Sequence, residues 1–413
     1  MIHRSMRPDE ILRAFVTRRE IALIDLRDEA TFALGHPLFA AQIPLARLAL
    51  EVPYSAPRRD CLVVIYDDGE GLTEDGARLL EQLGYSQVRT MAGGLSAWRE
   101  ADFELFQDVN SYSKAFGELV ESTRHTPSLP PEEVKALIDG GEHMAILDAR
   151  RFDEYATMAI PGAVSVPGAE LVLRARSLAP DPSTRIIVNC AGRTRSLIGA
   201  QALINAGIPN PVCALRNGTI GWTLAGYHLA LGQSRSFDAS SPESVLQARI
   251  AARSVAYRAG VCQIDAATLD DLSREPGRTL YRFDVRTETE YRQGHLPQFR
   301  HAPGGQLVQE IDMFAPVRGA RIVLADTLGV RADMTASWLA QMGWEIYVLA
   351  PDAGGEWTND PSANPPSRGP KGRYKRPYEG TDNPIAAMQA YLEWEYGLVA
   401  QLERDGSHGF FVI

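Results

Sequence analysis

The stretch RIIVNCAGRTRSLIGA, residues 185–200, decides how the chain folds, because it reads in succession as a buried strand, a tight loop and a helix. The apolar run at 186–188 is typical of a buried parallel strand. Gly192 permits a tight turn directly after that strand. Cys190 stands at the point where the strand passes into the loop, so the sequence predicts a thiol at the carboxyl end of a strand.

The loop that follows Cys190 is suited to holding an anion and an ionised thiol. We expect Ser196 to cap a helix that starts near Leu197. The loop amides and the N-terminus of this helix then point toward the sulfur. Arg193 and Arg195 add positive charge, and together these groups favour the thiolate over the thiol. A structural cysteine gains nothing from two nearby arginines, so we interpret Cys190 as a nucleophile.

The strand-and-loop pattern occurs three times along the chain. A short apolar strand closed by Asp-x-Arg is followed, at the same separation in each copy, by the end of a second strand. The paired positions are Asp25 and Asp67, Asp148 and Cys190, and Asp284 and Asp326. Each copy then closes on a glycine-rich turn with a tryptophan, namely Gly93-Gly94 with Trp98, Gly218 and Gly221 with Trp222, and Gly354-Gly355 with Trp357. We therefore predict three homologous units.

Strands that alternate with helices predict an α/β fold. We expect three tandem units, each a parallel sheet with helices on both faces, and a C-terminal helical tail. Helices are expected at 73–83, 196–206 and 331–342, with a tail helix at 384–404. The expected boundaries are a first unit at 1–107, a linker at 108–131, a second unit at 132–232, a linker with a helix at 233–260, a third unit at 261–360 and a C-terminal loop and helix at 361–413.

Composition excludes several classes of function. The chain has 413 residues with 45% hydrophobic and 23% charged content, a balance typical of globular proteins. A net charge of −10 argues against nucleic acid as a general partner. No apolar run is long enough to span a membrane, and residues 1–10 lack the apolar core of a signal peptide. We expect neither a membrane nor a nucleic acid partner.

The cysteines indicate a reducing environment. The four cysteines, Cys61, Cys190, Cys213 and Cys262, show no zinc-type spacing and no disulfide framework. The expected location is therefore the cytoplasm. Neither a metal nor another cofactor is expected.

The units resemble rhodanese domains in the order and spacing of their motifs. The middle copy carries Asp148-Ala-Arg150, Glu154-Tyr155, Ile160-Pro-Gly162-Ala163, the Cys190 loop and Asn217-Gly218 with Trp222. The first copy carries Asp25-Leu-Arg27 and Gly35-His36, and the third carries Asp284-Val-Arg286 and Gly294-His295. The layout is similar to that of multi-repeat rhodanese-related sulfurtransferases of bacteria. The middle copy departs from the pattern, since Met158-Ala159 stands where the family usually has Gly-His.

The resemblance implies that a sulfane sulfur moves through a persulfide on Cys190. The donor would be thiosulfate or a similar anion, and the acceptor a small thiol, cyanide or a protein thiol. Asp67 and Asp326 cannot carry sulfur, so the first and third copies are expected to be non-catalytic. The implied catalytic residue is Cys190, and the implied anion-binding loop comprises Ala191, Gly192, Arg193, Thr194, Arg195 and Ser196. Either Arg193 and Arg195 both attract the donor, or Arg195 ties the loop to a carboxylate.

Three other functions remain open at this point. The protein could be a persulfide carrier for a protein partner. It could be a phosphatase-like or arsenate-reducing enzyme, although those loops resemble Cys-x5-Arg and only four residues separate Cys190 from Arg195. The loops at 67–71 and 326–330 could form a binding module for a ligand or a cation. The basic cluster at 371–376 is interpreted as a solvated surface stretch.

Overall fold

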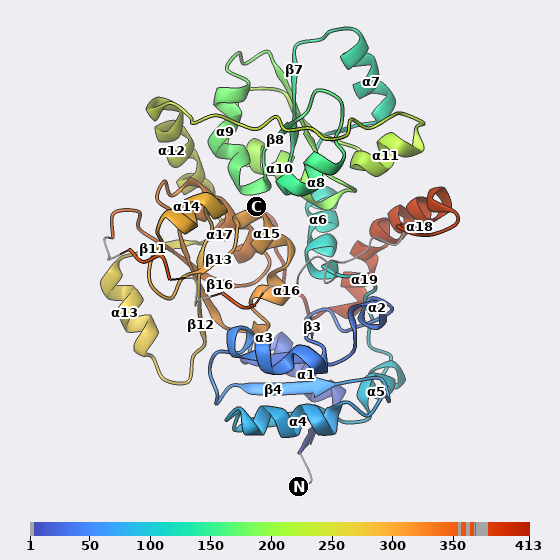
Figure 1. The fold of residues 1–413 in the computed structure, drawn as a ribbon, viewed down its shortest axis with the longest axis vertical. Coiled ribbons are helices and arrows are strands. Elements are labelled where there is room, and N and C mark those ends of the chain that lie inside the picture. Colours follow the sequence, from blue (N-terminus) through green and yellow to red (C-terminus); the bar gives the residue numbers. More distant parts are fainter. Residues whose placement is uncertain (1–3, 354–356, 361–363, 367, 369–378) are drawn as a thin grey trace.

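The computed structural model describes residues 4–353, 357–360, 364–366, 368 and 379–413. It contains three α/β units with one sheet each (Figure 1). In Figure 1 the first unit lies at the bottom, the second at the top and the third between them on one side. The third copy's Gly354-Gly355 and the basic cluster at 371–376 lie outside the described residues.

The first unit has the strand order β1-β5-β4-β2, with β3 paired to β2. Its elements are β1 (Ser5–Met6), α1 (Pro8–Val16), β2 (Ile21–Asp25), α2 (Glu29–Phe32), β3 (Ala41–Gln42), η1 (Leu45–Arg47), α3 (Leu48–Ser55), β4 (Leu62–Tyr66), α4 (Thr73–Gln82), β5 (Gln87–Met91) and α5 (Gly94–Glu100). Every residue of β2 and β4 is buried, as expected of central strands in a sheet covered on both faces.

The second unit repeats this order as β6-β10-β9-β7-β8. Its elements are β6 (Ser128–Leu129), α7 (Pro131–Asp139), β7 (Met144–Asp148), α8 (Phe152–Thr157), β8 (Val164–Ser165), η2 (Gly168–Glu170), α9 (Leu171–Leu178), β9 (Arg185–Asn189), α10 (Thr194–Asn205), β10 (Val212–Leu215) and α11 (Gly218–Leu224). The strand β9 lies between β10 and β7, so it is the central strand of the sheet. Its carboxyl end therefore lies in the middle of the row formed by the carboxyl ends of the strands.

The third unit has the order β11-β16-β15-β12-β13. Its elements are β11 (Cys262–Ile264), α13 (Ala266–Arg274), β12 (Leu280–Asp284), α14 (Glu288–Gln293), β13 (Arg300–His301), α15 (Gly304–Gln309), α16 (Ile311–Phe314), β14 (Val317–Arg318), β15 (Arg321–Ala325), α17 (Val330–Gln341) and β16 (Glu345–Leu349). The three predicted parallel sheets flanked by helices are confirmed.

One strand does not follow the parallel pattern. The short β14 leaves the third unit and pairs antiparallel with β2 of the first unit, with Val317 opposite Ala22 and Arg318 opposite Ile21. This pairing extends the first sheet with a strand from elsewhere in the chain, and it ties the first and third units together by main-chain hydrogen bonds.

Helices between the units bring distant parts of the chain together. The stretch 108–131, which its turn signals mark as a linker, contains α6 (Ser111–Arg124), a largely buried helix that packs on α10 and α19. The expected linker helix is α12 (Pro242–Arg258), which packs on α9 and α17. In Figure 1, α6 lies between the second unit and the first.

The C-terminal tail forms two helices where the sequence predicts one over 384–404. They are α18 (Pro384–Tyr396) and α19 (Leu398–Asp405), and Gly397 separates the two helices. Leu392, Leu398 and Leu402 are buried, so the apolar side of the tail packs on the rest of the protein.

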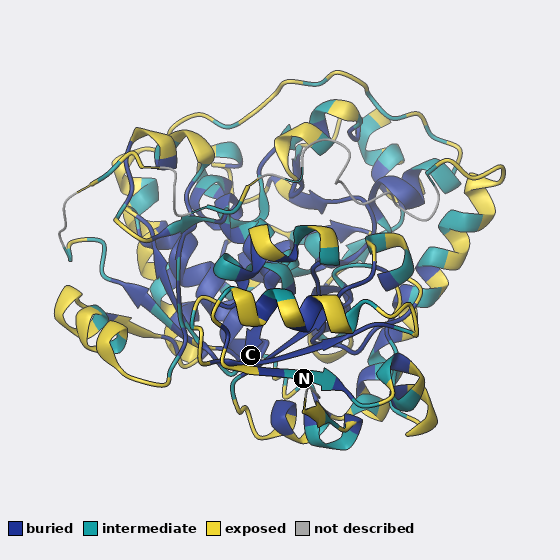
Figure 2. Cartoon of the chain, turned by 60° about the horizontal axis from the view of Figure 1, so that its bottom comes forward, coloured by how far each residue is buried: buried dark blue, intermediate teal, exposed yellow. Residues whose placement is uncertain are grey.

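Burial follows the layers of the fold. Figure 2 shows the strands almost entirely buried, and the outer helices buried on one side only. Trp98 and Trp222, which close the first and second units, are buried in the core, whereas Trp357 is 51% exposed. Within the described residues, no helix combines the length and the apolar character needed to cross a membrane.

Candidate active site

Cys190 lies directly between the end of β9 and the start of α10. Its side chain is 2% exposed, and its Sγ donates a hydrogen bond of 3.4 Å to the Ser196 Oγ. The helix begins at Thr194, three residues earlier than expected, and the residue at its N-cap is Arg193. The prediction that Ser196 caps the helix is therefore wrong: its hydroxyl lies in the first turn and donates to the Arg193 carbonyl at 2.8 Å. The extra turn brings the helix N-terminus closer to the sulfur.

The start of α11 fixes the backbone of the cysteine loop. The Cys190 carbonyl accepts from the Thr219 amide at 2.9 Å, and the Ala191 carbonyl accepts from the Ile220 amide at 2.9 Å. Gly218 makes this approach feasible, because a Cβ there would lie 2.3 Å from the Cys190 carbonyl oxygen. Its φ of +53° also lies in the left-handed region that favours glycine.

The equivalent loops of the first and third units, which follow Asp67 and Asp326, show that a loop of this kind binds a negatively charged group. In the first unit the Asp67 carboxylate accepts from the amides of Gly69 at 3.1 Å, Leu72 at 2.5 Å and Thr73 at 3.3 Å. These amides lie two, five and six positions after the aspartate. Asp67 therefore fills its own loop with a negative charge.

The third unit repeats this arrangement at the same positions. The Asp326 carboxylate accepts from the amides of Leu328 at 3.2 Å, Arg331 at 2.9 Å and Ala332 at 3.5 Å. Because both aspartates turn inward in this way, each loop is occupied by its own carboxylate rather than left open to a ligand.

The corresponding amides of the second unit belong to Gly192, Arg195 and Ser196. No acceptor among the described residues takes a hydrogen bond from any of these three amides. The cysteine loop thus presents the same three donors that hold a carboxylate in each sibling, and it presents them beside a sulfur atom. Donors arranged in this way stabilise an anion at Cys190.

The Arg193 side chain is not a free cation, because it is paired with carboxylates. Its guanidinium donates to Glu118 at 2.7 Å, is also paired with Glu121, and stacks over the Tyr396 ring with its centre 4.0 Å from the ring centroid. Burial alone would lower the pKa of Arg193, but the hydrogen bond and charge of Glu118 raise it above its usual value. Arg193 therefore clamps the loop to α6 and α18.

Arg195 has a similar structural partner. Its guanidinium donates to the Glu154 carboxylate at 2.6 Å. The third unit repeats this pair as Arg331 and Glu290, also at 2.6 Å. Since the pair is present in a unit that lacks the cysteine, it serves to hold the loop, in line with the alternative that Arg195 ties the loop to a carboxylate.

Cys190 and its loop line a cavity of about 630 Å³, and residues of all three units, of α6 and of the C-terminal tail line it as well. The first unit contributes Glu51, α6 contributes Lys114, the third unit contributes Arg300 and α18 contributes Glu395, among others. The two units with aspartate in their loops therefore form walls of the cavity that contains the cysteine.

The helix α18 closes over the loop at Gly192. A Cβ at Gly192 would lie 3.1 Å from the Glu395 Oε2 and 3.4 Å from the Tyr391 Cε1. Glu395 is 1% exposed, and burial raises its pKa to about 7, although the positive charge of Lys114 opposes the shift. A Cβ at position 192 would make a tight contact with this helix, so the Glu395 carboxylate would have to move slightly to accommodate it.

The raised pKa of Glu395 predicts a pH-dependent stability. Between about pH 5 and pH 7 the folded protein holds a proton that the unfolded chain has released, so the free energy of unfolding falls as the pH rises through this window. Glu395→Gln stays neutral, and we expect it to exceed the wild type in stability above pH 7 by on the order of 3 kcal/mol. Urea unfolding of both proteins at several pH values measures this difference. A difference that stays constant with pH would contradict the assignment.

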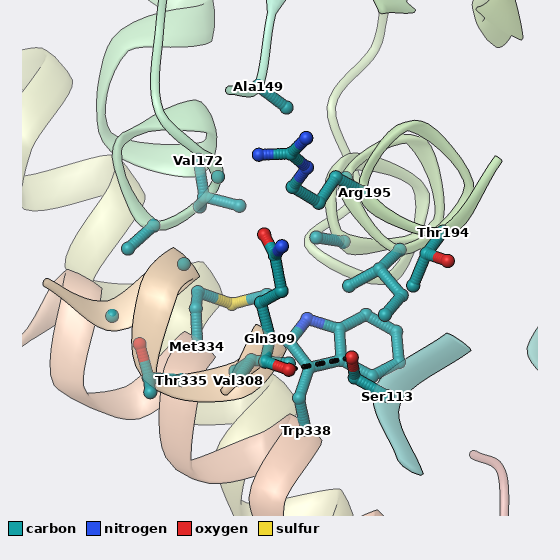
Figure 3. A pocket seen from close by; sticks show the side chains of 17 residues that line it. Ser113, Ala149, Val172, Thr194, Arg195, Val308, Gln309, Met334, Thr335 and Trp338 are labelled. Carbon is teal, nitrogen blue, oxygen red and sulfur yellow. Dashed lines mark hydrogen bonds between the residues drawn. The ribbon is translucent and has the colours of Figure 1, made fainter. Parts of the chain in front are cut away.

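A second, smaller cavity of about 50 Å³ lies where the second and third units meet. Figure 3 shows Thr194 and Arg195 of α10 on one side, with Met334 and Trp338 of α17 on the other. The Ser113 hydroxyl of α6 donates to the Gln309 carbonyl at 2.8 Å, the bond drawn in Figure 3. The start of α10 and the helix α17 of the third unit thus line the same small cavity.

Several residues of the cavity have no signal in the local sequence. Arg300, Asp312, Tyr391 and Glu395 line the cavity, come from segments far from Cys190 and belong to none of the repeated motifs. The same is true of Glu118, which accepts a hydrogen bond from Arg193. Within the described residues, no cluster of histidine, cysteine or acidic side chains is arranged to hold a metal ion.

Comparisons with known proteins agree with this architecture. The sequence matches the rhodanese-like domain family over residues 8–101, 130–225 and 265–352, more than half of the chain. The crystal structure of a thiosulfate sulfurtransferase from Pseudomonas aeruginosa is similar, with a TM-score of 0.92, 47% identity and coverage of 99% of this chain and 100% of that chain. The putative sulfur carrier protein YrkF of Bacillus subtilis (strain 168) is 30% identical over 102 residues, which is 24% of this chain and 54% of that relative's length. The chain therefore belongs to the rhodanese-like domain family, with three copies of the domain in tandem.

Proposed function

We propose that the protein is a sulfurtransferase that carries a sulfane sulfur on Cys190 of its second unit. The observation that supports this most is the set of amides at Gly192, Arg195 and Ser196, whose counterparts hold the carboxylates of Asp67 and Asp326. A persulfide anion on Cys190 would accept hydrogen bonds from the same set.

The proposed first step is a nucleophilic displacement on the donor. The Cys190 thiolate attacks the outer sulfur of thiosulfate, and a new sulfur–sulfur bond forms. The sulfur–sulfur bond of thiosulfate breaks, and its electron pair leaves with sulfite. Because the Arg193 and Arg195 side chains are paired with carboxylates, the loop amides carry the stabilisation of the anion.

In the proposed second step an acceptor nucleophile attacks the outer sulfur of the persulfide. The sulfur–sulfur bond on Cys190 breaks, and the electron pair returns to the cysteine as a thiolate. Cys190 is 2% exposed and lines a cavity beneath α18, which favours a small acceptor such as cyanide or a thiol over a protein thiol. All four cysteines are free thiols, which suits a reducing compartment such as the cytoplasm.

The names of the relatives support both the donor and the reaction class. The Pseudomonas aeruginosa protein, which is similar over nearly the whole chain, is named a thiosulfate sulfurtransferase. The Bacillus subtilis relative is named a putative sulfur carrier, and this supports the persulfide carrier as the second candidate. A carrier has to present its sulfur to another protein, for which the buried Cys190 is less suited.

Steady-state turnover tests the proposed function. With thiosulfate as donor and cyanide as acceptor, we expect sulfite and thiocyanate to form at equal rates. An aryl phosphate serves as the competing substrate, because a phosphatase-like loop would hydrolyse it. Hydrolysis of the phosphate ester without transfer of sulfur would contradict the proposal, and transfer only to a protein thiol would favour the carrier.

A further inference from the structure

Arg300 differs from the other basic residues that line the Cys190 cavity. Lys114 is paired with Asp108, Arg151 with Asp153, and Arg368 with Glu51. Arg193 and Arg195 have the carboxylate partners described above. No carboxylate among the described residues forms an ion pair with Arg300. Its positive charge is therefore uncompensated at the cavity wall.

The protein fixes the position of Arg300 through neutral contacts. Its Nη1 donates to the carbonyls of Tyr54 at 2.8 Å and Phe314 at 3.3 Å. Its guanidinium lies over the Phe283 ring, 5.3 Å from the ring centroid. Burial lowers the pKa of Arg300 to about 10, so the group remains charged at neutral pH. The guanidinium is thus preorganised between the first and third units, and its Nε is a buried donor without an acceptor in the described part of the chain.

Other residues that line this cavity also carry buried polar atoms without a partner. The Gln309 Oε1, the Asp312 Oδ1 and the Glu395 Oε2 are buried and have no partner among the described residues. All three residues line the cavity together with Arg300. Buried polar groups are nearly always satisfied in folded proteins, so several unsatisfied ones around one cavity indicate a polar ligand.

The size of the cavity argues for a ligand larger than thiosulfate. Three loop amides suffice for a single terminal anion, as the aspartates of the sibling units show. A volume of about 630 Å³ lies in the range of sites for organic molecules. Such a molecule can place its sulfur at Cys190 and a second charged group elsewhere on the wall.

We propose that Arg300 of the third unit is a binding subsite for the carboxylate of an organic thiol that accepts sulfur from Cys190. This inference rests on the proposed sulfurtransferase function. The acceptor sulfur, as a thiolate, attacks the outer sulfur of the Cys190 persulfide. The bond to the Cys190 sulfur breaks, the electron pair returns to Cys190, and an organic persulfide leaves. The carboxylate takes no part in the bond changes and orients the acceptor through Arg300.

The test compares two acceptors that differ in the carboxylate. With thiosulfate as donor, kcat/KM is measured for 3-mercaptopropionate and for 2-mercaptoethanol. We expect the wild type to prefer the carboxylate by roughly tenfold to hundredfold, the range of one charge-assisted contact. Arg300→Gln should abolish the preference through a raised KM, and Arg300→Lys, which keeps the charge, should retain part of it.

Two controls separate the outcomes. Arg151→Gln removes an arginine of the same cavity that is already paired, and it should leave the preference intact. Mass spectrometry of Cys190 after thiosulfate should show equal sulfur loading in the wild type and in both Arg300 variants, which also shows that they fold. Equal kcat/KM for the two thiols in the wild type, or a preference that survives Arg300→Gln, would overturn the subsite. If Cys190 is still loaded with sulfur in that case, the proposed function is not affected. Absence of loading in the wild type would overturn the proposed function itself.

Discussion

Replacing Cys190 by serine is expected to reduce sulfur transfer from thiosulfate by roughly a thousandfold or more, because a hydroxyl group is a weak nucleophile and cannot form the persulfide. Serine is nearly isosteric with cysteine, and within the described residues the Cys190 side chain makes one hydrogen bond, to the Ser196 hydroxyl. We therefore expect the folded structure to persist. The measurement is kcat/KM with thiosulfate and cyanide.

Cys213 provides a matched control for this substitution. It lies on β10, the strand next to β9, and burial raises the pKa of its thiol to about 11. Its Sγ lies 3.8 Å from the Ile186 carbonyl and lines no described wall of the Cys190 cavity. Cys213→Ser should keep sulfur transfer within a few-fold of the wild type. Full activity in Cys190→Ser, or equal losses in the two variants, would contradict the assignment of the nucleophile.

Gly218→Ala is expected to have the second largest effect, because the added Cβ would meet the backbone of the cysteine loop. It would lie 2.3 Å from the Cys190 carbonyl oxygen and 2.8 Å from the Gly192 carbonyl oxygen. Neither atom can move without displacing the loop. A displacement of about 1 Å in a catalytic group can reduce the rate by roughly a hundredfold, and we expect a loss of this size in kcat/KM.

Gly207→Ala separates the steric effect from backbone strain. Gly207 has a φ of +65°, close to the +53° of Gly218, but a Cβ at Gly207 meets nothing within 4 Å. Both alanine variants therefore carry the strain of a left-handed residue, about 1 kcal/mol, and only Gly218→Ala also displaces the loop. Urea unfolding and kcat/KM are measured for both. If the two variants lost equal activity, the contact between α11 and the loop would not position Cys190.

The local pattern of the sequence was sufficient to predict the repeated fold. The centres of buried strands such as β4 and β9 are continuous apolar runs. The separation between Asp148 and Cys190 recurs between the paired aspartates of the other two units, so it identifies the same two strands in each unit. A strand and the loop after it depend mainly on neighbouring residues, so the position of Cys190 at a strand end could be predicted.

Features that depend on tertiary packing could not be predicted in this way. The helix α10 begins at Thr194, and the Arg193 side chain that precedes it pairs with Glu118 of α6, a partner that no local pattern predicts. The sequence places Glu118 in an expected linker and Glu395 in a tail without a motif. Glu118 and Glu395 lie at the cysteine loop because α6 and α18 pack there, and no local spacing in the sequence encodes this packing.

The first and third units, which carry aspartate in place of the cysteine, contribute to the structure of the site. Their carboxylates show where a loop of this shape holds negative charge, and their outer surfaces form walls of the cavity around Cys190. The third unit also contributes Arg300, so a unit without a nucleophile can still bind the substrate of its neighbour.

The proposed reaction requires a sulfur atom to reside on Cys190 between its two steps. The most direct measurement is mass spectrometry of the wild-type protein after incubation with thiosulfate and removal of excess donor. We expect the peptide containing Cys190 to gain the mass of one sulfur atom, and cyanide to remove it. A Cys190 peptide of unchanged mass in a protein that still releases sulfite would contradict the account.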